Sequence, residues 1–206
     1  MAGPFLILLV IAHLQAVLVA WGLALLTARG LPRLRLRLPP GATGRLSLAF
    51  GCYGLAALAE SLDHTRSDWI YVNQISPWNG LFFVFLSSGL ALLAAAVRGG
   101  RGLHGLLLAL VVASGLGYAT IGKAGPIAVQ VALLVVMLQL WWRCFHDWRL
   151  WLYPLFTVGL TTLFGALLNS SGDQLWHLFI GPAGSISLLL LWLILRRADR
   201  TTRPNG

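Results

Sequence analysis

The sequence FLILLVIAHLQAVLVAWGLALLT, residues 5–27, decides the fold of this chain. It contains no acidic or basic residue except one histidine, and the basic stretch ARGLPRLRLRLPPGATGR follows it directly over residues 28–45. A helix of roughly 20 apolar residues crosses about 30 Å of hydrocarbon. We therefore expect residues 5–27 to span a membrane. A cleaved signal peptide is disfavoured because the basic residues follow the apolar run instead of preceding it.

Six further apolar runs are bounded by charged residues, glycine or proline. They cover residues 46–63, 78–97, 103–121, 125–143, 150–168 and 173–195. The composition agrees, since 58% of the 206 residues are hydrophobic and only 10% are charged, against about 25% charged in soluble proteins. The sequence predicts an all-α integral membrane protein with seven transmembrane helices in a single domain, residues 1–206. Two cysteines exclude a disulfide scaffold.

The basic residues predict the orientation of these spans. All of the fifteen Lys and Arg residues except Arg66 and Lys123 fall in the first, third and fifth loops or in the C-terminal tail. Cytoplasmic loops collect Lys and Arg, so we expect the N-terminus outside the cell and the C-terminus in the cytoplasm. The expected location is a bacterial inner (plasma) membrane. The net charge of +9 thus reports orientation, and no nucleic-acid partner is expected.

Most of the acidic residues gather at the predicted outer ends of the second and seventh spans, together with two histidines. They are Glu60, Asp63, Asp68 and Asp173, with His64 and His177. Residues four apart lie on one helix face, so Glu60 pairs with His64 and Asp173 pairs with His177. If the second and seventh helices pack together, the two pairs can face each other across a cavity.

Imidazole and carboxylate groups are ligands for zinc, and a catalytic zinc site keeps three protein ligands and one open position for water. The predicted zinc ligands are His64, Asp173 and His177. Glu60 or Asp68 would then orient a ligand or act as the general base. A simpler interpretation is that each group is a hydrated cap at the interface, with Asp173 at the start of the seventh helix.

His13 lies inside the first span, about two turns from its start. His104 and His146 lie at the predicted inner ends of their spans, so no other histidine is expected at the depth of His13. We therefore interpret His13 as a buried, hydrogen-bonded core histidine rather than a ligand.

At these residues the chain resembles the superfamily of seven-span metal hydrolases that includes alkaline ceramidases, adiponectin-type receptors and lipid-remodelling enzymes of GPI anchors. The stretch ESLDH, residues 60–64, is similar to the Ser-x-x-x-His motif of that superfamily's second span. The stretch DQLWH, residues 173–177, is similar to the His-Ala-Trp-Trp-His motif of the seventh. The resemblance implies a ceramidase-like lipid amidohydrolase.

The chain also departs from these motifs. Asp173 replaces a histidine, Glu60 stands at the serine position, and Asp68 follows His64 more closely than the family's aspartate does. A carboxylate in place of an imidazole changes the charge of the site and its choice of metal.

Three functions follow as alternatives. The first is metal-dependent hydrolysis of a lipid amide or ester near the outer membrane face, with a membrane lipid as partner. The second is proton-coupled transport or a proton relay through the same acid and histidine groups. The third is a non-catalytic membrane scaffold. The oligomeric state stays open.

Overall fold

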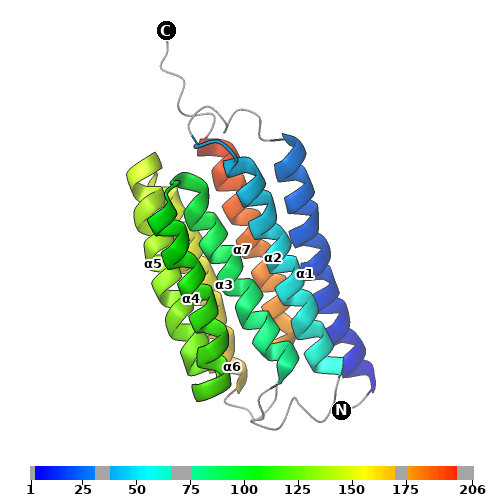
Figure 1. The fold of residues 1–206 in the computed structure, drawn as a ribbon. Coiled ribbons are helices and arrows are strands. Elements are labelled where there is room, and N and C mark those ends of the chain that lie inside the picture. Colours follow the sequence, from blue (N-terminus) through cyan, green and yellow to red (C-terminus); the bar gives the residue numbers. More distant parts are fainter. Residues whose placement is uncertain (1–2, 31–37, 66–75, 170–175, 199–206) are drawn as a thin grey trace.

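The computed structural model describes residues 3–30, 38–65, 76–169 and 176–198, and these ranges form an up-and-down helix bundle (Figure 1). Its α-helices within those ranges are α1 (Gly3–Gly30), α2 (Ala42–Thr65), α3 (Pro77–Val97), α4 (Arg101–Ile121), α5 (Ala124–Phe145), α6 (Leu152–Asn169) and α7 (Trp176–Ala198). A short 3-10 helix, η3 (Trp148–Trp151), precedes α6. The described residues contain no strand, so the predicted all-α fold is confirmed.

The helices follow the predicted apolar runs closely. The sixth run begins later than expected, because residues 148–151 form η3 before α6 starts. The Asp147 carboxylate caps η3 by accepting the Arg149 backbone N–H at 3.0 Å, and its hydrogen bonds from the Arg149 guanidinium lower the pKa of Asp147. The first residues of the seventh run, 173–175, lie outside the described residues.

Five of the described helices, α1, α3, α4, α5 and α7, are individually long and apolar enough to cross a membrane. By contrast, α2 is the least apolar helix of the bundle. It packs extensively against α1 on one side and α3 on the other. Polar groups inside a membrane face the bundle interior because lipid cannot solvate them. The position of α2 therefore shelters its polar side chains.

The two ends of the bundle differ in charge. Seven described arginines lie at or beside the ends of helices on one side, which we call the arginine end: Arg29, Arg45, Arg98, Arg101, Arg143, Arg149 and Arg196. The opposite side, which we call the Glu60 end, holds the start of α1, the end of α2 and the start of α3 (Figure 1). Because successive helices alternate in direction, these seven arginines, which were predicted to share a loop side, do share one end.

Helix packing around α5 depends on one large side chain near one end of the helix and on small residues near the other. Trp141 of α5 is 1% exposed, and its Nε1–H donates a hydrogen bond of 2.8 Å to the Leu93 carbonyl of α3. Between α4 and α5, a Cβ added at Gly125 would lie 2.6 Å from the Gly117 carbonyl carbon. Close backbone contact of this kind is what small residues permit in membrane bundles.

The packing order of the helices places α1 next to the predicted site. Among the described residues, α1 packs extensively against both α2 and α7, whereas α2 and α7 are not among the extensively packed pairs. The second and seventh helices were considered as direct neighbours, but in the described residues α1 makes the extensive contacts with each of them. A side chain of α1 takes the place beside α2 instead.

Candidate functional site

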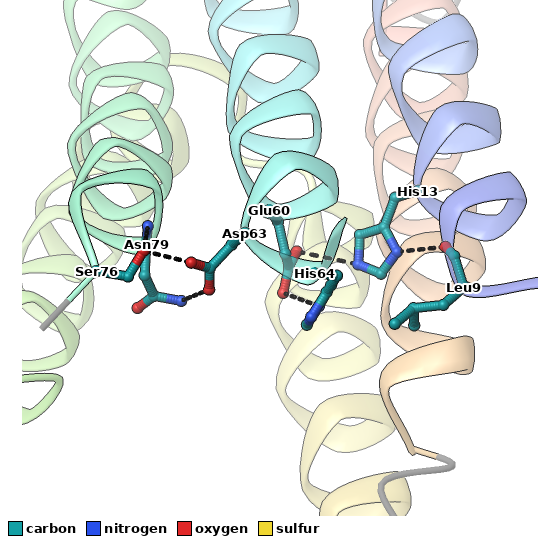
Figure 2. Close-up of polar contacts among 7 residues, drawn as sticks. All are labelled: Leu9, His13, Glu60, Asp63, His64, Ser76 and Asn79. Atoms are coloured by element: carbon teal, nitrogen blue, oxygen red, sulfur yellow. Dashed lines mark hydrogen bonds and ion pairs between the residues drawn. The ribbon is translucent and has the colours of Figure 1, made fainter. Parts of the chain in front are cut away.

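His13 of α1 is completely buried, and its orientation is fixed by its own helix. Its Nδ1 lies 2.8 Å from the Leu9 carbonyl oxygen, one turn earlier. Because a carbonyl only accepts, this contact assigns the proton to Nδ1 and leaves the lone pair on Nε2. Nε2 is buried without a hydrogen bond of standard geometry in the described part of the chain, and the Glu60 Oε2 atom lies 3.5 Å from it (Figure 2).

Glu60 and His64 stand one turn apart on α2 and point toward His13 (Figure 2). The distance from Glu60 Oε1 to His64 Nε2 is 4.0 Å. The rings of His13 and His64 meet edge to face, with their centroids 4.9 Å apart. Glu60 is 8% exposed and His64 is 4% exposed. The three side chains therefore form one buried cluster between α1 and α2, which we call the His13–Glu60–His64 cluster.

The geometry of this cluster fits a metal ion. Each residue offers one ligand atom, and these atoms all lie within 4.8 Å of one another. Two ligands of a tetrahedral zinc ion, each about 2.1 Å from the metal, are roughly 3.4 Å apart. The contacts of Glu60 with the two histidines, 3.5 and 4.0 Å, and the 4.8 Å limit for the whole set all exceed that value. To bind one ion, these side chains would have to move closer together than they lie in this structure.

The hydrogen bond of His13 to a backbone carbonyl also suits a ligand. Metal-binding histidines usually donate the other ring N–H to a carbonyl or carboxylate, which fixes the ring and makes the ligand nitrogen more basic. In this structure Leu9 supplies that carbonyl. His13 is thus held with Nε2 directed at α2 before any ion binds.

Asp63, adjacent to His64, faces the opposite way and contacts α3 (Figure 2). Its carboxylate accepts hydrogen bonds from the Ser76 hydroxyl and, at 3.5 Å, from the Asn79 side-chain amide. Ser76 is the N-cap of α3, and its backbone N–H donates to the Tyr118 hydroxyl of α4 at 3.1 Å. Asp63 therefore joins the end of α2 to the start of α3 and lies outside the His13–Glu60–His64 cluster.

Replacement of Asp63 by alanine tests this structural role. We expect a loss of about 1–3 kcal/mol of stability, because the buried Ser76 hydroxyl loses its acceptor. The measurement is thermal unfolding in detergent, with Thr65→Ala on the exposed side of the same helix as the control. Equal stability of the Asp63→Ala and Thr65→Ala proteins would contradict the structural role of Asp63.

The structure brings together only part of the predicted site. Glu60 and His64 lie in one cluster, as their spacing indicates. Asp68 and Asp173 lie outside the described residues, and the side chain of His177 does too, although its backbone begins α7. The proposed roles of these three residues stay predictions.

His13 is buried and hydrogen-bonded, as predicted, but the expectation that no other histidine lies at its depth was wrong. Glu60 and His64 lie beside it. His13 is ten residues after the start of α1 and Glu60 five residues before the end of α2, which corresponds to roughly 15 Å and 8 Å along the two helices. The apolar pattern does not specify how far one helix is shifted along its neighbour. A search for acid and histidine residues on the same bundle end would have found His13, although its depth argued against it.

Comparisons with known proteins identify a family for this chain. A family model described as "Seven transmembrane receptor" matches residues 5–201. Neither curated proteins nor solved structures give a match. The family match supports the predicted seven-span membrane protein, and it does not support the resemblance to the superfamily of alkaline ceramidases and adiponectin-type receptors.

Proposed function

The chain belongs to this family of seven transmembrane receptors, and from that premise we propose that it is a membrane receptor that binds a divalent transition metal ion between α1 and α2. Zinc is the ion that the ligands suit best. The observation that carries the proposal is the buried His13–Glu60–His64 cluster, with its three ligand atoms within 4.8 Å.

The electrostatics of the cluster support a bound cation. A carboxylate buried in a bundle is costly unless a positive charge or a metal ion compensates it. Two imidazoles of the cluster lie beside the Glu60 carboxylate, and the His13 Nδ1 atom is directed at the Leu9 carbonyl. A dication bound by two neutral imidazoles and one carboxylate balances the Glu60 charge. Imidazole ligands favour zinc, copper or nickel over magnesium or calcium.

The burial of the cluster favours a receptor over an enzyme. His13 is 0% exposed and Glu60 is 8% exposed, so an ion reaches the ligands more easily than a lipid headgroup does. An ion that joins α1 to α2 favours the conformation in which the two helices are packed together. Ion binding can thus change the populations of bundle conformations, which is what a receptor requires.

A specific observation also favours the hydrolase as a second candidate. Two histidines and one glutamate are the ligand set of several catalytic zinc sites, and they leave the fourth position for water. The test is release of fatty acid from ceramide or phospholipid in mixed micelles by the zinc-loaded protein. Turnover that disappears in the His64→Ala variant would establish the hydrolase, and no turnover by the zinc-loaded protein would exclude it for these lipids.

The proposed orientation places the cluster near the outer face. The arginine end would lie in the cytoplasm, since cytoplasmic loops collect Lys and Arg, and the Glu60 end would face the opposite side of a bacterial plasma membrane. A receptor of this orientation responds to metal ions outside the cell. Accessibility of cysteines introduced at Thr65 and at Arg98 to a membrane-impermeant reagent in intact cells tests this orientation, with labelling expected at Thr65 only.

The direct test of the receptor proposal is zinc titration of the chelator-treated protein in detergent against a zinc-binding dye. We expect one zinc per chain. A triple variant, His13→Ala with Glu60→Gln and His64→Ala, should lose the site. The control variant replaces His104 and His146, which are exposed at the arginine end, and should bind zinc normally. Absence of stoichiometric zinc, or equal binding by the triple variant, would overturn the proposal.

A further inference from the structure

The helix α7 touches α1 directly beside the metal ligand His13. The contact is made by Gly181, which is buried. A Cβ added at Gly181 would lie 2.5 Å from the Ala12 carbonyl oxygen and 3.4 Å from the His13 backbone nitrogen. Carbon and oxygen atoms in ordinary contact are about 3.5 Å apart. Only glycine therefore permits α7 to approach the backbone of α1 at this level.

A second contact lies one turn further along α7. The hydroxyl of Ser185 is directed at the Gly181 carbonyl, 2.9 Å away, and at the Gln15 Oε1 atom of α1, 3.2 Å away. Ser185 is 4% exposed. Its contact on α1 lies two residues after His13, and the Gly181 contact lies one residue before it. Helix α7 thus contacts α1 at Ala12, just before His13 in the sequence, and at Gln15, just after it.

The residue after Gly181 is a proline, which interrupts the backbone hydrogen bonding of α7. Pro182 lies inside α7, and a proline has no N–H to donate to the carbonyl four residues earlier. Helices commonly bend at such a step. The Gly181–Pro182 step therefore removes one backbone hydrogen bond of α7 at the level where this helix meets Ala12.

The position of α1 relative to α2 matters because metal sites tolerate little displacement. Ligand distances in a formed site vary by about 0.2 Å around their usual values. Relief of the contact between an added Cβ and the Ala12 carbonyl requires a shift of about 1 Å. Such a shift acts on the backbone that carries His13, while Glu60 and His64 stay on α2.

We propose that Gly181 is a positioning residue of the metal site: its contact with Ala12 sets the place of His13 opposite α2. The inference rests on the proposed metal-binding function. It extends the site from two helices to three, because α7 determines whether α1 can supply its ligand. Metal occupancy and the packing of α7 on α1 are then linked.

The test compares Gly181→Ala with Gly184→Ala on the same helix, where an added Cβ meets no atom within 4 Å. We expect the Gly181 variant to bind zinc about 10–100-fold more weakly, the usual effect of losing support for a ligand. The Gly184 variant should bind like the unmodified protein. The absorption spectrum of bound Co²⁺ should change only in the Gly181 variant, because its ligand geometry is altered.

A double variant distinguishes a positioning role of Gly181 from a general loss of protein stability. If Gly181 acts through His13, then adding Gly181→Ala to a His13→Ala protein should weaken zinc binding no further. An equal loss in both backgrounds, or normal zinc binding and Co²⁺ absorption by the Gly181 variant, would overturn the inference. If the unmodified protein binds no zinc, the proposed function itself fails, which is a distinguishable result.

A milder variant covers the case in which Gly181→Ala does not fold. Ser185→Ala removes the hydrogen bond to Gln15 and adds no atoms. We expect its zinc affinity to fall severalfold, by less than in the Gly181 variant, with unfolding of the metal-free protein nearly unchanged. Unaltered affinity in the Ser185 variant would then count against the inference.

Discussion

Replacement of His13 by alanine is expected to weaken zinc binding by at least about 100-fold. Structural zinc sites with four ligands contribute about 10–16 kcal/mol, so loss of one ligand costs roughly 3 kcal/mol, which is about 100-fold in affinity. Competition titration with a zinc-binding dye measures the change. His104→Ala, at the exposed start of α4, is the matched control and should bind zinc as the unmodified protein does.

The same experiment decides between the two ligand sets. The sequence predicts His64, Asp173 and His177, whereas the described residues bring His13 and Glu60 to His64. If zinc affinity falls in His177→Ala and not in His13→Ala, the ligands come from α2 and α7, and the assignment of His13 is wrong. If it falls in His13→Ala and Glu60→Gln, the ligands come from α1 and α2.

Replacement of Trp141 by alanine should have the largest effect on stability. A buried tryptophan replaced by alanine costs about 3–5 kcal/mol, because the cavity is not refilled and the hydrogen bond to the Leu93 carbonyl is lost. The neighbouring Trp142 is 40% exposed, so Trp142→Ala serves as the control and should change stability little. Thermal or denaturant unfolding in the same detergent compares the two variants.

One outcome would contradict this view of the core. Equal destabilisation by the two tryptophan variants would mean that Trp141 has no special place between α3 and α5. Zinc affinity gives a further check. Trp141 lies near the arginine end of the bundle, whereas the proposed metal site lies near the Glu60 end. A Trp141→Ala protein that still folds should therefore bind zinc normally.

The sequence was sufficient for the helices because each apolar run has the length of a membrane span and ends at charged residues, glycine or proline. Residues 78–97 and 103–121 correspond almost completely to α3 and α4. The spacing of Glu60 and His64 was also sufficient to place them on one face of α2. These features depend on local sequence alone.

The remainder of the site depends on contacts between helices. Hydropathy does not tell how far α1 is shifted along α2, so His13 could not be matched with Glu60. Nor does it tell that α1 packs against both α2 and α7, which is why the predicted ligands were sought on the second and seventh spans. Asp63 was expected at the same outer end as Glu60, and its place on α2 directs it to Ser76 of α3.

X-ray absorption spectroscopy of the protein loaded with one zinc per chain tests the central claim most directly. We predict a zinc ion bound by two imidazole nitrogens and carboxylate oxygen, with zinc–nitrogen distances of about 2.0–2.1 Å. In the His13→Ala protein, loaded at higher zinc concentration, one imidazole should be lost from the spectrum. A zinc environment with no imidazole, or one identical in the two proteins, would contradict a metal site built from His13, Glu60 and His64.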